Sequence, residues 1–331
     1  MGRVTEKIRG VLAERFGLAI NRTGNLYPWQ VRPMLAGSHT VKVHEEAHAY
    51  LRLDNPRLLE LERRYAKFDP AVITPTVWNS TKISAEDLLY FRGDNPYVFQ
   101  LRSRNGNELS YALTYYYLRA GATQRILDAI DEDGAFGVHT WTFEGKRVSR
   151  DLLDSVAEID FLQRHAGLGT TATSILDIGA GYGRLAHRIA EVMPDVTVSA
   201  TDAFPSSTFL SDYYLRFRGS RARVVPLDEI EDVLAGRSIE IATNIHSFSE
   251  CPPSAIDWWV SRLARHRVRQ LMVIPNISAS DGRCLTNRGE DMDAIFARHG
   301  YVCRIREGRY ADPVAMRWGV DGSMLSLFDL T

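Results

Sequence analysis

The sequence predicts an α/β fold, in which a seven-stranded and largely parallel sheet follows a helix-rich N-terminal region. Two observations lead to this prediction. From Ser174 onward, short apolar runs alternate with segments of helical periodicity, and this alternation indicates βαβ units and a parallel sheet. The last two strand-like runs are joined by a loop alone, which is typical of an antiparallel pair at a sheet edge.

Residues 149–331 form the predicted second domain. Its strands are expected at 174–178, 196–201, 221–226, 239–243, 270–274, 301–306 and 324–328. Helices are expected at 183–193 and 206–217, the first with Leu185 and Ile189 on its apolar face.

Residues 1–148 form the predicted first domain, which is rich in helical segments and scattered aromatic residues. Helices are expected at 58–68 and 108–120, whereas the proline-containing stretch 69–75 is expected to be a loop. A linking helix at 149–165, with Ser149 as its N-cap, should join the two domains.

Composition excludes several classes of protein. The chain has 331 residues, of which 45% are hydrophobic and 24% charged, as in globular proteins of one large or two modest domains. No apolar run is long enough to span a bilayer, and the N-terminus lacks the apolar core of a signal peptide, so we expect a soluble cytoplasmic protein. The net charge of −1 disfavours nucleic-acid binding, and three widely spaced cysteines fit neither a disulfide framework nor a zinc ribbon.

A glycine-rich motif, DIGAGYG at 177–183, follows the first predicted strand and precedes a helix. Its spacing is GxGxG, whereas a dinucleotide fingerprint would place a glycine where Arg184 stands. The carboxylate of Asp177 suits the cation of S-adenosylmethionine (SAM), and Asp202, at the end of the next strand, is placed to bind a ribose diol. The alternatives are an ordinary strand-to-helix corner for the glycines and a helix N-cap for Asp202.

These residues resemble those of known enzymes. Residues 150–331 resemble the Rossmann-like class I SAM-dependent methyltransferases, whose seven-stranded sheet has an antiparallel terminal strand. The chain is more narrowly similar to bacterial sugar O-methyltransferases of polysaccharide biosynthesis and glycoside pathways. The segments that carry the resemblance are 175–186 (ILDIGAGYGRLA), 201–215, 243–251, 105–118 and 148–162. It implies methyl transfer from SAM to a sugar hydroxyl, with S-adenosylhomocysteine (SAH) as product.

The resemblance also implies a set of cofactor-binding residues. They are Asp177, Gly179, Gly181, Gly183, Asp202, Asp228 and Asn244. The glycines would line the methionine part and Asp177 would lie near its ammonium. Asp202 would bind the ribose, and Asp228 would lie near the adenine, unless it caps the helix at 229–234. Asn244 would contact the ammonium or the acceptor.

His246, two residues beyond Asn244, is the first candidate for the general base. A sugar hydroxyl loses its proton during transfer, and an imidazole near neutral pKa suits that task. The alternative is a histidine that only shapes the loop. Glu250 would orient the imidazole or cap the helix at 253–264, and His139 is the second candidate base.

The acceptor should be recognised by the N-terminal region, which we expect to cap the cleft and to offer a homodimer surface. The candidate substrate-binding residues are Arg102, Tyr111, Tyr115 and Trp141. Aromatic faces suit the C–H faces of sugars, although such residues more often belong to a core. A chain truncated near Ser149 should then keep its cofactor affinity and lose acceptor turnover. Mg²⁺ needs only one or two carboxylates, and we predict no metal site.

Other functions remain open at this point. The acceptor could be a non-sugar small-molecule hydroxyl or amine, or the protein could bind SAM without catalysis. A nucleic-acid methyltransferase is disfavoured by the charge balance and by the absence of an (N/D)PP(Y/F) motif at 243–251.

Overall fold

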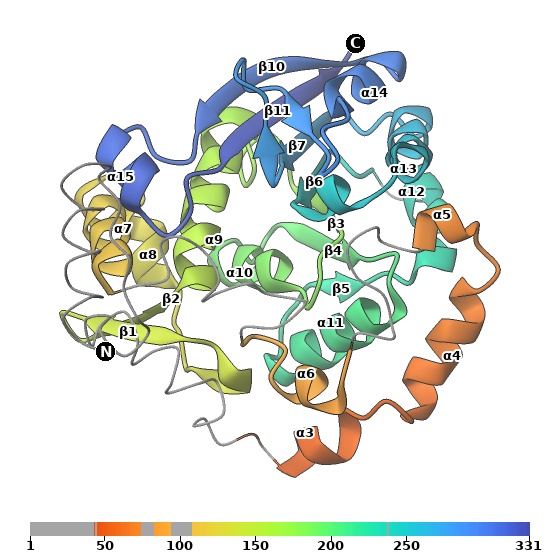
Figure 1. Cartoon of the computed structure of the whole chain (residues 1–331), viewed down its shortest axis with the longest axis horizontal. Helices are drawn as coiled ribbons and strands as arrows, with labels where there is room; N and C mark the ends of the chain where they lie inside the picture. Colours follow the sequence, from red (N-terminus) through yellow and green to blue (C-terminus); the bar gives the residue numbers. More distant parts are fainter. Residues whose placement is uncertain (1–42, 44, 74–82, 94–107, 237) are drawn as a thin grey trace, which may run out of the picture.

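The structure is a computed structural model that describes residues 43, 45–73, 83–93, 108–236 and 238–331. Its centre is a seven-stranded sheet (Figure 1). The strands are β3 (Ser174–Ile178), β4 (Thr197–Thr201), β5 (Arg223–Val224), β6 (Ile241–Ile245), β7 (Gln270–Ile274), β10 (Tyr301–Gly308) and β11 (Met324–Leu330). Each overlaps one of the predicted strands, so the predicted fold class is confirmed.

The strand order across the sheet is β10-β11-β7-β6-β3-β4-β5. The strands from β7 to β5 are parallel, and β11 lies antiparallel between β7 and β10. This is the class I methyltransferase arrangement. After β3 the chain builds outward to β4 and β5, and it then returns to place β6 on the other side of β3. The carboxyl ends of β3 and β6 therefore form a topological switch point, where open α/β sheets bind ligands.

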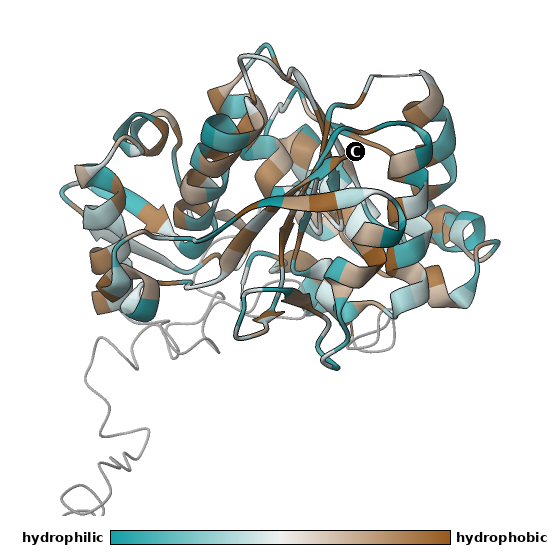
Figure 2. Ribbon diagram, turned by 90° about the horizontal axis from the view of Figure 1, so that it is seen from above, coloured by the Kyte–Doolittle hydropathy of each residue, from teal (hydrophilic) through white to brown (hydrophobic). Residues whose placement is uncertain are grey.

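Helices cover both faces of this sheet, because right-handed crossovers on the two sides of β3 place their helices on opposite faces. The crossover helices are α10 (Arg184–Val192), α11 (Pro205–Phe217), α12 (Ile230–Gly236) and α13 (Pro253–Arg265), followed by α14 (Met292–Arg298) and α15 (Pro313–Trp318). Apolar residues gather on the central strands and the inward helix faces (Figure 2). Among them, Ile175, Leu176 and Ile241 on β3 and β6 are fully buried.

The linking helix is α9 (Arg150–Phe161), which ends in a π-helical turn, η5 (Leu162–Ala166). Ser149 is its N-cap, as predicted, since its side chain accepts the N–H of Leu152 at 3.0 Å. Almost every residue of α9 is buried, because the helix packs against α10 and against the N-terminal elements.

The N-terminal elements are α3 (Glu45–Tyr50), α4 (Pro56–Tyr65), α5 (Pro70–Ile73), α6 (Ala85–Leu89), α7 (Glu108–Ala120), α8 (Gln124–Ala129), η4 (Ala135–Gly137), and the hairpin β1 (Thr140–Phe143) and β2 (Lys146–Ser149). Two features differ from expectation. The predicted loop at 69–75 contains α5, because proline is well placed in the first turn of a helix. The hairpin was not predicted, and its turn has positive φ at Glu144 and Gly145.

No helix in the described ranges is long and apolar enough to cross a membrane. The boundary between residues 148 and 149 stays a prediction, as does the homodimer.

Candidate functional site

A cavity of about 560 Å³ opens at the carboxyl ends of β3, β4 and β6. Three chain segments at the ends of these strands line the cavity, namely residues 177–182, 202–204 and 245–248. The start of α9 contributes Arg150 and Asp154. The sheet topology therefore brings the glycine motif, Asp202 and the candidate base into one cavity.

The glycines of the motif have different tasks. Gly179 has φ 69°, and a Cβ there would lie 1.9 Å from the Oγ of Ser247. Gly181 has φ 58° and lines the cavity, and no described atom lies within 4 Å of its hypothetical Cβ. Gly183 lies behind the cavity, where a Cβ would be 2.7 Å from the Oγ of Ser211 on α11. Gly179 and Gly181 thus shape the cavity wall, and Gly183 allows helix packing.

The two predicted carboxylates both line the cavity. Asp177 accepts a hydrogen bond from the Oγ1 of Thr243 at 2.7 Å, and burial raises the pKa of Asp177 to about 6. Asp202 accepts the N–H groups of Gly181 at 3.0 Å and Phe204 at 2.8 Å. Burial raises the pKa of Asp202 to about 7, although these two hydrogen bonds oppose the rise. Both carboxyl groups would gain from a cationic or hydroxyl-bearing ligand.

Asn244 and Asp228 are placed differently from the expectation. The buried side chain of Asn244 donates to the carbonyl of Ile178 at 2.9 Å and accepts the N–H of Phe248 at 2.8 Å, so it holds the loop together. Asp228 is not among the described residues that line the cavity. Its carboxylate instead accepts two hydrogen bonds from Arg64.

His246 lines the cavity directly after β6, with φ 66° and ψ −36°. Its Nε2 lies 3.8 Å from the Oδ2 of Asp321, while its buried Nδ1 has no hydrogen-bond partner among the described residues. Burial lowers the pKa of His246 to about 4, although Asp321 opposes the fall. The imidazole is therefore neutral at physiological pH, which is the form that can accept a proton.

Asp321 belongs to a charge cluster that forms part of the cavity wall and extends behind it. Its Oδ2 lies 3.3 Å from Arg150 and 3.2 Å from Arg309. Burial alone would raise the pKa of Asp321, but Arg309 and Arg150 hold it well below its usual range. Asp154 lies 3.2 Å from Arg150 and 3.5 Å from Arg309. Burial raises the pKa of Asp154 to about 6, although these two cations oppose the rise. The cluster extends to Glu158, which pairs with both Arg309 and Arg184.

The other predicted catalytic residues, Glu250 and His139, have different surroundings. Glu250 lines the cavity and accepts a hydrogen bond from Asn276 at 3.4 Å, whereas the carboxylate of Asp321 lies 3.8 Å from His246. His139 packs edge-on against Tyr111 and Trp141, and burial lowers the pKa of His139 to about 4. It is not one of the described residues that line the cavity.

The predicted acceptor residues form a separate aromatic group. Tyr111 and Tyr115 are buried in the core, and Trp141 packs against it. None of these three lines the cavity as far as the structure describes it. Arg102 lies outside the described residues. The role of these residues in acceptor binding stays a prediction.

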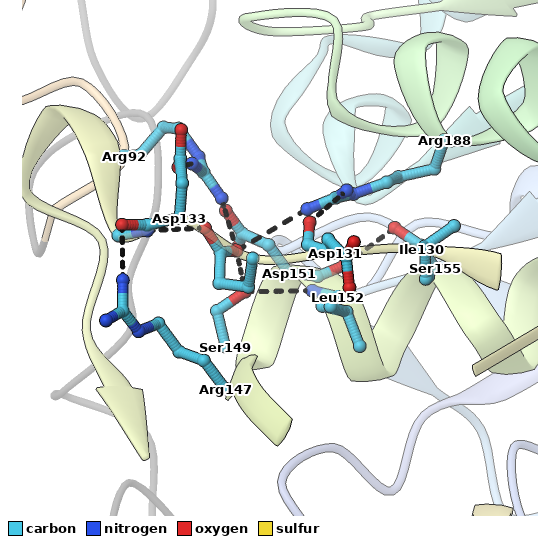
Figure 3. Close-up of polar contacts among 12 residues, drawn as sticks. Arg92, Ile130, Asp131, Asp133, Arg147, Ser149, Asp151, Leu152, Ser155 and Arg188 are labelled. Atoms are coloured by element: carbon cyan, nitrogen blue, oxygen red, sulfur yellow. Dashed lines mark hydrogen bonds and ion pairs between the residues drawn. The ribbon is translucent and has the colours of Figure 1, made fainter. Parts of the chain in front are cut away.

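A second buried charge cluster connects the glycine motif to the N-terminal elements, and Figure 3 shows Arg92, Asp151 and Arg188 of this cluster. Tyr182 of the motif donates a hydrogen bond to Asp151 at the start of α9. Arg92 lies 3.7 Å from Asp151, pairs with Glu132 at 2.6 Å, and places its guanidinium 5.8 Å from the ring centre of Tyr182. Arg188 also pairs with Glu132, at 3.5 Å. The motif is thus anchored from outside the sheet.

Several cavity residues were not predicted from the sequence as cavity residues. Arg150, Asp154 and Asp321 come from α9 and from the loop before β11, and Val72 and Ile73 come from α5. The position of Arg150 and Asp154 in the first turns of the linking helix is a feature of the sequence from which their place in the cavity could have been predicted. Asp321 lies in no motif. In the part of the chain that the structure describes, no group of three or more His, Cys, Asp or Glu residues could hold a metal ion.

No family model and no curated protein sequence matches this chain. Solved structures with similarity include magnesium protoporphyrin IX methyltransferase (ChlM) from Synechocystis PCC 6803 with bound SAM, which is 12% identical, covers 66% of this chain and 96% of its own, and has a TM-score of 0.39. The pyocyanin biosynthetic protein PhzM is 16% identical, with coverages of 54% and 57% and a TM-score of 0.39. TrmK of M. capricolum in complex with SAH is 13% identical, with coverages of 51% and 67% and a TM-score of 0.34. The strand order of the chain itself defines its fold class.

Proposed function

We propose that this protein is a SAM-dependent methyltransferase that transfers a methyl group to a hydroxyl of a sugar or glycoside. The observation that carries this proposal is the meeting of the glycine motif, Asp177, Asp202 and His246 in one cavity, at the switch point of a class I methyltransferase sheet. The residues of the cavity suit SAM. Carboxylates line the cavity and attract a cationic nucleoside, and the open space at Gly181 lets the ligand approach the backbone.

Asp177 would hold the ammonium group and Asp202 the ribose hydroxyls, while Gly181 lets the backbone approach the ligand closely. When bound, the cofactor supplies an electrophilic methyl group on a sulfonium. His246 is neutral and faces the cavity, so it can accept the proton of the acceptor hydroxyl. Asp321, at 3.8 Å, would then stabilise the protonated imidazole.

The lining of the cavity supports a neutral, hydroxyl-rich acceptor. Among the described lining residues are two guanidinium groups, of Arg150 and Arg184, and six carboxyl groups, of Asp151, Asp154, Asp177, Asp202, Glu250 and Asp321. An anionic acceptor would be repelled by this excess of carboxyl groups. Ser323 and Asn276 also line the cavity and offer hydrogen bonds to hydroxyl groups.

The same carboxyl excess favours a second candidate, methylation of a small-molecule amine. A protonated amine would be attracted into the cavity, but it must lose its proton before it can attack. Paired acceptors that differ only in an amino or a hydroxyl group distinguish the two candidates.

The test is transfer of a labelled methyl group from SAM to a panel of neutral sugars and glycosides, the matching amino sugars, and the matching uronic acids. We expect turnover of neutral sugars and none of uronic acids. Binding of SAM and SAH is measured separately by calorimetry. Absence of SAH binding would contradict the methyltransferase assignment, whereas SAH binding with turnover of amines alone would replace the acceptor.

A further inference from the structure

The three helices α3, α4 and α5 form a strap, residues 45–73, that runs from α11 to α13 (Figure 1). At its start, the ring of Tyr50 stacks on Phe209 with centroids 5.2 Å apart. Near its end, Phe68 packs edge-on against Trp258 of α13 at 6.0 Å. The last two residues of the strap, Val72 and Ile73, form part of the cavity wall.

Two residues at the end of α4 fix the strap to the turn that follows β5. Arg64 donates to both carboxylate oxygens of Asp228, at 2.8 and 2.7 Å, and to Glu229 at 2.8 Å. The buried hydroxyl of Tyr65 accepts the N–H of Leu227 at 2.7 Å and bonds to Thr208 at 2.9 Å. Asp228 and the backbone of Leu227 are therefore engaged by the strap.

The cavity has two regions of different chemistry. On the α9 side, Arg150, Asp154 and Asp321 are charged and contact one another. On the strap side, Val72 and Ile73 of α5 pack toward α13, which carries Trp259, and Phe204 directly follows the Asp202–Ala203 pair. A nucleoside with an amino-acid tail also has a charged part and an apolar part, because its tail is charged while its base is flat and largely apolar. Asp202, the proposed ribose partner, lies next in sequence to the apolar region.

We propose that Val72 and Ile73 form, with Phe204 and Trp259, the wall that binds the adenine ring of the cofactor, and that Arg64 is a positioning residue for this wall. The proposal rests on the proposed function, because it takes the cofactor to be SAM. It assigns part of the cofactor site to the N-terminal region, which the sequence predicts to serve the acceptor and dimerisation. In this arrangement, apolar contacts with the strap hold the base. Asp228 contributes by pairing with Arg64, which holds the strap in place.

The test compares two ligands by calorimetry on the full-length chain. SAH carries both the base and the amino-acid tail, whereas 5′-methylthioadenosine lacks the tail. The double variant Val72→Ala/Ile73→Ala should weaken both ligands by the same factor, about tenfold, because the lost apolar contact is with the shared base. Asp177→Asn should weaken SAH and leave 5′-methylthioadenosine nearly unchanged, since only SAH has an ammonium group. The exposed Val314→Ala, outside the cavity, is the control that should change neither affinity.

Arg64→Met should weaken both ligands, and Arg64→Lys should restore part of the loss, because it keeps a cation beside Asp228 and Glu229. If the double variant is unfolded by circular dichroism, Ile73→Thr replaces it, since this change keeps most of the volume while adding a hydroxyl. A wild-type protein that binds neither ligand would contradict the proposed function itself. Wild-type binding with double-variant affinities within about twofold, or a loss confined to SAH, would overturn the assignment of the base wall to the strap.

Discussion

The backbone at His246 adopts a conformation that residues with a Cβ rarely take, with φ 66° and ψ −36°. Such strain is found where the surrounding structure overrides local preference, and here the N–H of His246 is fixed by the carbonyl of Ile274 at 2.7 Å. We expect the free energy of unfolding of the His246→Gly variant to be about 1 kcal/mol higher than that of the His246→Ala variant, because glycine tolerates positive φ. Urea denaturation of both variants measures this difference, and equal stabilities would show that the backbone is relaxed.

Replacement of the His246 side chain should affect turnover and leave cofactor affinity unchanged. We expect His246→Ala to lower kcat by about 10²- to 10⁴-fold, the usual contribution of a positioned base, while SAH affinity stays near wild type. His246→Gln keeps bulk and polarity without a titrating group, so it should be equally impaired. The acidic limb of the wild-type pH–rate profile should lie near pH 4, since the pKa of His246 is lowered to about 4. An Ala variant within about threefold of wild type would exclude His246 as the base.

Gly181 and Gly219 form a matched pair for testing the cavity. Both have φ 58°, and no described atom lies within 4 Å of a hypothetical Cβ at either position. Only Gly181 lines the cavity. Gly181→Val and Gly219→Val should therefore carry similar backbone strain, while only Gly181→Val should lose SAH affinity, by at least about tenfold. Equal SAH affinities of the two variants in calorimetry would place the ligand elsewhere.

At the scale of elements, the connection between α8 and the β1–β2 hairpin depends on Glu132. Its buried carboxylate accepts hydrogen bonds from Arg92 at 2.6 Å and from Ser149 at 2.6 Å. Burial alone would raise the pKa of Glu132, but Arg92 and Arg188 lower it to about 2. Glu132→Gln leaves two buried guanidinium groups without this counter-charge and should destabilise the fold by about 3–5 kcal/mol.

The neighbouring Asp133 provides the control for that prediction. Its half-exposed carboxylate pairs with Arg218 near the surface, so Asp133→Asn should destabilise by about 1 kcal/mol or less. Urea denaturation compares the two variants. Equal effects would mean that the buried pair contributes no more than the surface pair.

Most elements could be predicted because their signals are local. The strands β3, β6 and β7 are short apolar runs, and Ser149 marks the start of α9 by an ordinary capping preference. The β1–β2 hairpin lacks such a signal, since Glu144 occupies a position of its turn that usually carries Asn or Gly. Helix α5 was mistaken for a loop because Pro70 can either end a helix or begin one.

At the scale of the whole molecule, cofactor binding should depend on pH. In the free protein, burial raises the pKa of Asp177 to about 6 and that of Asp202 to about 7. Both groups thus bind a proton more tightly when folded, so their contribution to stability is greatest at acid pH and is lost as pH rises through about 6 and 7. A cationic ligand favours the ionised carboxylates and should release protons when it binds.

We therefore expect SAM affinity to rise from about pH 5 to about pH 8, with proton release detected by calorimetry in buffers of different ionisation enthalpy. Asp202→Asn should remove the part of this dependence near pH 7. An affinity that is constant over this range would mean that neither carboxyl group changes its ionisation on binding.

The candidate site could be predicted only as far as the sheet topology dictates it. Asp177 lies at the end of β3, and Asp202 and His246 directly follow β4 and β6. Neighbouring parallel strands end at the same edge, so the meeting of these residues follows from the order of the strands. Asp321 and Val72 follow no such rule. They reach the cavity through the packing of a late loop and of the strap, which depends on the whole tertiary structure.

The antiparallel strand β11 has a consequence for how the chain is made. It fills an interior position between β7 and β10, yet its residues, Met324–Leu330, follow both of these strands in the sequence and are therefore synthesised after them. Until it inserts, β7 presents an unpaired and apolar edge to other nascent chains. Asp321 and Ser323 arrive with the same segment. The glycine motif can therefore be complete while the sheet is still open, and the insertion of β11 ends the interval in which edge-to-edge aggregation competes with folding.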